Sequence, residues 1–412
     1  MTSAMTRSDA PLRDVLPPEL MVLVSLHQPE RWSQIVGDVD WVKVGELAAH
    51  HRLQGKLARA LPAATQVEVP ERLLAELVRH RERTASRFAT KALPQIEEVC
   101  SALVDHDVQP TLLKGTSMIL SGLAAASERP ISDIDVLVPR LRARVAQAAL
   151  DQLGYRTRQG EQVREWAWNN HYQDAPLHHP DRRLSIDLHW HIQPRRHRIP
   201  FPIDTMQRVP LELPSGLVVQ RFANTDELAH LCLHFWKDRE QGRAGALGQL
   251  WDIHAAAGRL TAQDWTVLAT RSQHRGHART VAAVLAIAHL LLETPVPPGF
   301  RLVGEMAADE RTSSFAIRRV LAPRPEHIQL LMVTPGVAYT PARVLARVFA
   351  YLRRPSDRLD DAAATVTSRW HARFRHVRFT LSCLSRSLSA FRETRAEMGL
   401  DHWAHELDTI DR

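Results

Sequence analysis

Cysteine is scarce in this chain of 412 residues. Its three cysteines, Cys100, Cys232 and Cys383, lie far apart in apolar segments and form no C-x-x-C pair. An odd number of isolated cysteines argues against a disulfide framework. We therefore expect buried thiols in a protein of the reducing cytoplasm.

Long apolar segments are also lacking. The longest, Val281 to Leu292, is interrupted by His289 and is well short of the roughly 20 residues that span a bilayer. Residues 1–14 alternate polar and small side chains without an apolar core, which is not typical of a secretory signal. These absences predict a cytoplasmic protein without a membrane span.

Lysine is the third scarce residue type, because it supplies only five of the 53 basic side chains. Basic residues exceed acidic ones by seven, and residues 338–400 alone hold twelve arginines against five acidic residues. The excess positive charge therefore belongs to one C-terminal segment. We interpret this segment as a solvated or acidic-partner-binding face, with an acceptor-binding surface as the alternative.

What remains is ordinary globular composition, 44% hydrophobic and 24% charged, in a chain long enough for two or three domains. Apolar residues at helical spacing predict an N-terminal helical region over 1–107, kinked at Pro94. Residues 108–221 alternate between strand and helix patterns, which is typical of an α/β core. Helical spacing returns over 222–294, and a Pro-rich linker and an Arg-rich helical region fill 295–412.

Two segments of the core have the alternation of strands. Residues 131–138 place apolar side chains on one face and the carboxylates of Asp133 and Asp135 on the other. Residues 184–192 alternate in the same way, with Asp187 in the middle of the segment. We expect two strands, each carrying acidic side chains on one face.

These three carboxylates predict a metal site. Asp133 and Asp135 point the same way, and two like charges that close together need a cation between them. Carboxylate oxygens are the ligands that Mg²⁺ prefers. Asp187, costly to bury unpaired, would be the third carboxylate of a two-metal phosphoryl-transfer site and would accept the proton of the attacking group.

A candidate phosphate-binding segment lies upstream. Lys114, Gly115, Thr116 and Ser117 follow a β-compatible stretch over 108–113 and precede a helical pattern over 118–126. Glycine lets the backbone approach a phosphate, while helical N–H groups and hydroxyls donate to it. Arg129, four residues before Asp133, is a further candidate for phosphate oxygens.

The stretches 112–117, 129–138 and 187–190 resemble, in order and context, the uncharacterised bacterial nucleotidyltransferase family of the polymerase-β superfold. The resemblance extends over about residues 39–257. It implies an α+β fold: a polymerase-β-like nucleotidyltransferase core, made of a small mixed sheet with helices, flanked by N- and C-terminal helical regions.

The resemblance also implies site residues. Asp133 and Asp135 would be metal ligands, Asp187 the third carboxylate, and Gly115 with its neighbours the triphosphate loop. Lys114-Gly115 stands where a Gly-Ser pair is usual, and the interval from the glycine to the aspartates is longer than usual. We expect Lys114 to take over part of the triphosphate contact.

The predicted activity is metal-dependent transfer of a nucleoside monophosphate from a nucleoside triphosphate to a hydroxyl, with release of pyrophosphate. ATP is the expected donor, two Mg²⁺ ions are the expected cofactors, and the acceptor is a small molecule, a peptide or protein, or RNA. The alternative is a non-catalytic nucleotide- or RNA-binding protein that keeps the fold. The sequence leaves the acceptor and the oligomeric state open.

Some polar residues have two interpretations. His189 and His191 share a strand face with Asp187, so a zinc site is conceivable, but no further ligand is apparent and the family pattern accounts for them. Asp252 is a lone carboxylate in an apolar helical stretch. It is an outlier that would fit the lining of an active-site cleft.

A polar stripe at helical spacing contains His230, His234 and Lys237. We favour a solvated face for it. The alternative is that the stripe lines the active-site cleft, with Lys237 as a candidate phosphate contact. Trp166 and Trp168 would stack on a nucleotide base in one interpretation and serve only packing in the favoured one.

Overall fold

The computed structural model describes the chain in six ranges, with residues 165, 168, 173 and 174 in addition: 16–35, 39–64, 67–158, 176–192, 203–240 and 245–297. The Arg-rich segment and Trp166 lie outside the described residues, so the predictions for them are not tested. No helix within the described ranges is long and apolar enough to cross a membrane.

The first part of the chain is helical, as its spacing predicts. Its helices are α2 (Pro18–Val24), α3 (Trp32–Ile35), α4 (Trp41–His50), α5 (Gln54–Ala60), α6 (Glu71–Arg87) and α7 (Leu93–Asp105). The predicted distortion at Pro94 takes the form of a π-helical segment, η3 (Phe88–Ala92), between α6 and α7. Proline has no N–H, so the helical hydrogen bonds shift their register just before it.

The strands of the middle region are short. They are β1 (Thr111–Leu112), β2 (Asp133–Leu137), β3 (Arg156–Thr157), β4 (Leu177–His178), β5 (Ser185–His189), β6 (Arg208–Glu212) and β7 (Val218–Phe222). They form one mixed sheet in the order β3-β4-β5-β2-β1-β7-β6. In its centre β2 pairs parallel with β5 and antiparallel with β1. This mixed sheet with its many helices confirms the α+β class.

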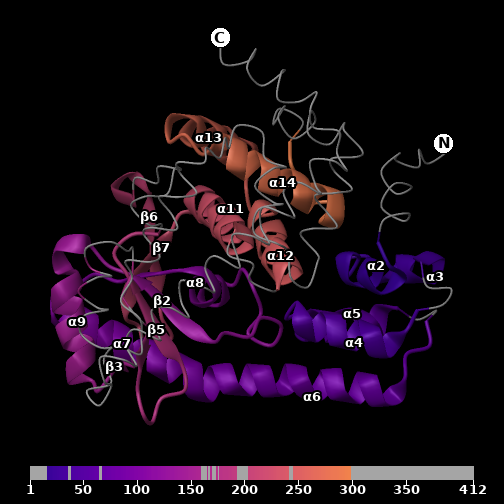
Figure 1. Ribbon diagram of the computed structural model, residues 1–412, viewed down its shortest axis with the longest axis horizontal. Coiled ribbons are helices and arrows are strands. Elements are labelled where there is room, and N and C mark those ends of the chain that lie inside the picture. The colour runs from indigo at the N-terminus through magenta and orange to yellow at the C-terminus, as the bar shows by residue number, and fades with distance from the viewer. Residues whose placement is uncertain are drawn as a thin grey trace, which may run out of the picture.

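Helices cover both faces of the sheet. Ile134, Val136 and Val138 point into a core shared with α7 and α9 (Ala143–Gln152), as the alternation of residues 131–138 predicts. The opposite face of the sheet meets α8 (Lys114–Leu120) and α11 (Asn224–Glu240) (Figure 1). The predicted carboxylates lie on this second face.

Helix α8 begins earlier than its sequence pattern predicts. The pattern placed the helix over 118–126, whereas α8 starts at Lys114 and is followed by Gly122, with a φ of +68°. Glycine adopts this left-handed conformation at little cost, and it ends helices for that reason. The predicted triphosphate loop is therefore the first turn of a helix.

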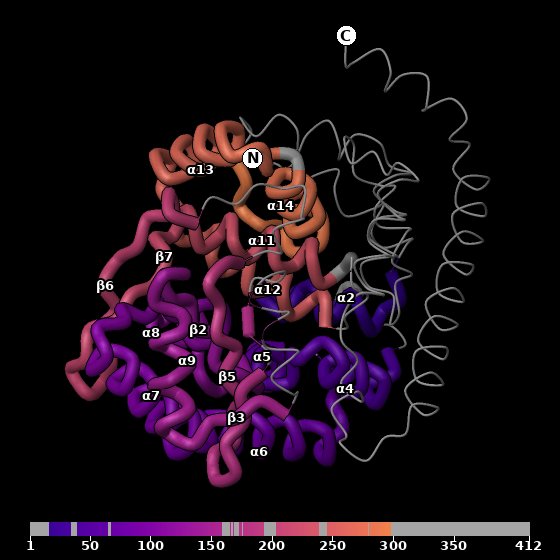
Figure 2. Tube along the Cα trace, turned by 60° about the vertical axis from the view of Figure 1, so that its left-hand side comes forward, coloured from indigo at the N-terminus to yellow at the C-terminus, as the bar shows by residue number. Residues whose placement is uncertain are grey.

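The two helical regions share one hydrophobic core. Side chains from residues 16–77 pack with those of α11, α12 (Ala246–Ala257), α13 (Ala262–His274) and α14 (Ala278–Leu292). Indole Nε1 of Trp251 donates to the carbonyl of Leu23 at 3.1 Å across this core. Figure 2, turned by 60° from Figure 1, shows α2, α4 and α5 near α12. Segments from the two ends of the described chain thus form one helical body beside the sheet.

Candidate active site

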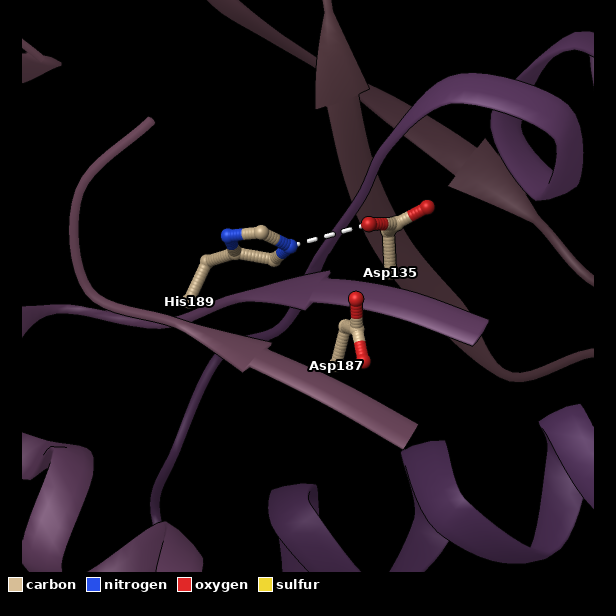
Figure 3. A group of neighbouring side chains, drawn as sticks. All are labelled: Asp135, Asp187 and His189. Carbon is tan, nitrogen blue, oxygen red and sulfur yellow. Dashed lines mark hydrogen bonds and ion pairs between the residues drawn. The ribbon is translucent and has the colours of Figure 1, made fainter. Parts of the chain in front are cut away.

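Strand pairing brings two of the predicted carboxylates together. In the parallel pair of β2 and β5, the Cα of Asp135 lies opposite that of Asp187. Directly opposite residues point to the same face of a sheet, and Figure 3 shows both carboxylates above the two strands. Asp135 is buried and Asp187 half-buried. The pair is thus open on the side of β5.

His189 is the third member of this cluster. Its Nε2 lies 2.9 Å from Oδ1 of Asp135, and the imidazole donates to that carboxylate (Figure 3). Ligand atoms of Asp135, Asp187 and His189 lie within 4.8 Å of one another. The sequence had predicted Asp133 as the third ligand beside Asp135 and Asp187. It contained the signal for His189, which stands two residues after Asp187 on the same face, but not the strand register that sets this histidine beside Asp135.

Asp133 lies on the same face as Asp135, two residues earlier on β2, with Ser185 opposite it. Burial, followed by the charge of Asp135, raises the pKa of Asp133 above its ordinary value. The charge of Asp187 acts in the same direction. The three predicted carboxylates therefore repel one another on one face, as a site built for a cation requires.

Lys114 supplies a cation from the chain itself. Its Nζ lies 2.5 Å from Oδ1 of Asp135, the oxygen that His189 also contacts. Burial opposes the charged ammonium, but the charge and hydrogen bond of Asp135, with the charges of Asp133 and Asp187, raise the pKa of Lys114 overall. Burial likewise opposes the charge of Asp135, yet Lys114 and His189 hold the pKa of that carboxyl well below its usual range.

The backbone of Lys114 adopts a left-handed conformation, with a φ of +50°. A side chain in this region costs on the order of 1 kcal/mol and persists only where the surroundings impose it. Here the preceding residue, Leu113, is extended and caps α8, so the chain turns sharply at Lys114. The turn directs the ammonium at Asp135.

Gly115 accommodates an arginine. A Cβ at this position would lie 2.0 Å from Nη1 of Arg129. Arg129 in turn is held by Asp252, which accepts from Nε at 3.1 and 3.0 Å and from Nη2 at 2.8 Å. The outlying carboxylate of α12 is thus the partner of the predicted phosphate ligand, and the small size of Gly115 makes room for the guanidinium.

The two hydroxyls of the predicted triphosphate loop are buried. Ser117 Oγ donates to Oε1 of Glu227 on α11 at 2.8 Å. Thr116 is 1% exposed, and its Oγ1 has no hydrogen-bond partner among the described residues. In this conformation Lys114 is the residue of the loop whose polar group reaches the carboxylates.

The polar stripe on α11 is not a solvated face, so the favoured interpretation of it was wrong. His230 and Lys237 are each 4% exposed, because α11 lies between the sheet and the helical core. The ring of His230 packs edge-on against Phe222 at 5.6 Å. Burial, followed by the charge of Lys114, lowers the pKa of His230 far below its usual value.

The other candidates lie apart from the cluster. Trp168 packs against Trp190, with ring centroids 5.1 Å apart, and under the guanidinium of Arg144 at 4.4 Å. These contacts support the packing interpretation. His191 is half-buried and is not part of the ligand cluster found among the described residues.

The chain is similar to a known protein family. A family model described as "Uncharacterised nucleotidyltransferase" matches residues 37–293. The match covers the sheet, the carboxylate cluster and the helices from α4 to α14. No curated protein and no solved structure matches the chain.

Proposed function

Because this chain belongs to the family of uncharacterised nucleotidyltransferases, we propose that it moves a nucleoside monophosphate from a nucleoside triphosphate to an acceptor hydroxyl and releases pyrophosphate. The observation that carries this proposal is the register of β2 and β5, which sets Asp135 directly beside Asp187 with Asp133 two residues away. ATP as the donor and a cytoplasmic location stay predictions from the sequence.

We further propose that the sheet is the polymerase-β-like core predicted from the resemblance. Two features support this: an Asp-x-Asp pair on a central strand, and a third aspartate on the neighbouring parallel strand. The helix that starts at Lys114 lies against β2. Triphosphate and acceptor would thus meet on the face of the sheet that carries the carboxylates.

The donor set fits a divalent cation, because carboxylates of two strands and an imidazole offer ligand atoms within 4.8 Å of one another. Asp133, Asp135 and Asp187 would hold the metal, with Mg²⁺ and two ions as the prediction from the sequence. A bound ion would neutralise the triphosphate and stabilise charge on the leaving pyrophosphate.

The residues of the chain then have separate tasks. Asp187, the half-buried carboxylate, accepts the proton of the acceptor hydroxyl. Lys114 exchanges its contact with Asp135 for the triphosphate. Arg129 uses Nη1, which lies over Gly115 and donates to no described residue, while Asp252 fixes its other nitrogens. Lys237, buried on α11, adds positive charge near His189.

The test is pyrophosphate release from each nucleoside triphosphate, with a cell extract as the source of acceptor. Asp135→Asn and Asp187→Asn should each lower the rate by at least about 100-fold, because metal-bound charge stabilisation is worth several kcal/mol. Asp181→Asn, which changes an exposed carboxylate, is the matched control. Undiminished turnover in folded Asp135→Asn would refute the proposal. Nucleotide binding by the wild type without any pyrophosphate would favour the non-catalytic alternative.

A further inference from the structure

The cluster around Asp135 differs from a purely acidic site, because one of its ligand atoms is an imidazole nitrogen. His189 is 2% exposed and Asp135 is 4% exposed, so both are fixed inside the protein. The register of β5 on β2 places His189 opposite Leu137 and leaves its ring over the carboxylates. The ring is therefore part of the site by virtue of strand pairing.

The spacing of the ligand atoms suits joint coordination of one ion. Metal bonds of about 2.1 Å set at right angles separate neighbouring ligand atoms by about 3 Å. Nε2 of His189 and Oδ1 of Asp135 are 2.9 Å apart. A carboxylate oxygen of Asp187 lies within 4.8 Å of a ligand atom of each of these two residues. The hydrogen bond between His189 and Asp135 can thus be replaced by an ion that both residues bind, with little movement of either.

We propose that Nε2 of His189 is a metal ligand, and that the site takes a first-row transition ion such as Mn²⁺ in preference to Mg²⁺. Imidazole nitrogen suits transition ions, whereas Mg²⁺ prefers an all-oxygen shell. Coordination through Nε2 keeps the imidazole neutral with its proton on Nδ1. The ammonium of Lys114 leaves Oδ1 of Asp135, because two cations do not share that position. The use of the ion in catalysis rests on the proposed function, but its binding does not.

Electron spin echo envelope modulation of the full chain loaded with Mn²⁺ tests the ligand directly. The wild type should show ¹⁴N coupling typical of a bound imidazole, which changes to the ¹⁵N pattern when only histidine is labelled with ¹⁵N. His189→Gln should lose the coupling. His178→Gln, which changes a half-buried histidine on the neighbouring strand β4, should keep it.

Competition between the ions tests the preference. In the wild type Mn²⁺ should bind at least about tenfold more tightly than Mg²⁺, and His189→Gln should reduce that ratio. Absence of nitrogen coupling in the wild type, or its survival in His189→Gln, would overturn the assignment. If His189→Gln does not fold, the ¹⁵N-histidine measurement on the wild type decides alone.

The pyrophosphate assay keeps this inference separate from the proposed function. Turnover without nitrogen coupling would remove His189 from the ligand set and leave the nucleotidyltransferase proposal standing. Nitrogen coupling without turnover for any nucleotide would keep His189 as a metal ligand and count against the nucleotidyltransferase proposal.

Discussion

Arg129 can hold its position only because residue 115 is a glycine. Residue 115 has no side chain, and the guanidinium of Arg129 occupies the space where one would be. The bidentate contact with Asp252 prevents the guanidinium from moving aside freely. Gly115, which the sequence predicts to admit a phosphate, therefore also makes room for the guanidinium of Arg129.

Gly115→Ala should lower the free energy of unfolding by about 1–3 kcal/mol, the usual cost of overpacking. The cause is the displacement of Arg129 from Asp252, so the same substitution in an Arg129→Ala background should cost much less. Urea unfolding of the four proteins of this cycle measures both values. Equal costs in the two backgrounds would show that Arg129 is not the obstacle, and Gly258→Ala, at a position with looser contacts of 3.5 Å or more, is the control.

The sequence predicts which face of a strand a residue lies on, but not which distant residue it contacts. The alternation of residues 131–138 correctly predicts which side chains of β2 face the core, because it depends only on the period of a strand. Asn224 and Glu227 have the spacing of a helix cap, yet Asn224 is the first residue of α11 and Glu227 accepts from Ser117 and Arg221. Both partners of Glu227 come from outside α11, and the local spacing contains no information about them.

At the scale of elements, the segment between α8 and β2 is held by the helical region. Glu128 accepts from Nε of Arg59 at 3.0 Å and lies 3.8 Å from Nζ of Lys56, both on α5. Gly55 permits this contact, since a Cβ there would lie 2.4 Å from the carbonyl oxygen of Ser127. The long interval between Gly115 and the aspartates is therefore an anchored connection that sets the position of Arg129.

Glu128→Gln should destabilise the protein by about 1–3 kcal/mol, because it removes the counter-charge of a largely buried lysine. Since Arg129 is the next residue, the affinity for nucleoside triphosphate should fall as well. Thermal unfolding and nucleotide titration measure the two effects. Glu293→Gln removes a carboxylate from an exposed pair with Arg31 and should cost less than about 1 kcal/mol. A similar cost for both variants would refute the anchoring role.

At the scale of the whole molecule, two histidines lie where the first helices meet the last ones. The rings of His27 and His254 are 5.5 Å apart, next to Trp251. Burial, followed by the charge of His27, lowers the pKa of His254 to about 4, and burial also lowers the pKa of His27. Both rings are therefore neutral in the folded protein at neutral pH.

When folding lowers the pKa of a basic group, the folded protein becomes less stable as the pH falls. Between about pH 6.5 and pH 4 the unfolded chain binds more protons than the folded one, so stability present above pH 6.5 should decline as the pH falls. The slope from one such histidine approaches about 1.4 kcal/mol per pH unit. Urea unfolding from pH 8 to pH 4.5 measures the slope. His254→Gln should flatten it, and an unchanged slope in that variant would assign the dependence to other groups.

The sequence by itself determined the features that depend on neighbours along the chain. These are the alternating faces of two strands, the helical spacing at both ends, the predicted aspartates and the family to which they belong. Local periodicity and residue type are sufficient for such features, because the backbone geometry of a strand or helix repeats within a few residues.

Only the tertiary structure decided which side chains meet. The pairing of β2 with β5 put His189 on Asp135, α12 supplied Asp252 to Arg129, and burial of α11 between sheet and helices enclosed His230 and Lys237. Each of these contacts joins residues more than 50 positions apart or depends on packing from both sides. Contacts of that kind arise only when the whole chain folds, because no local pattern encodes the register or the partner of an element.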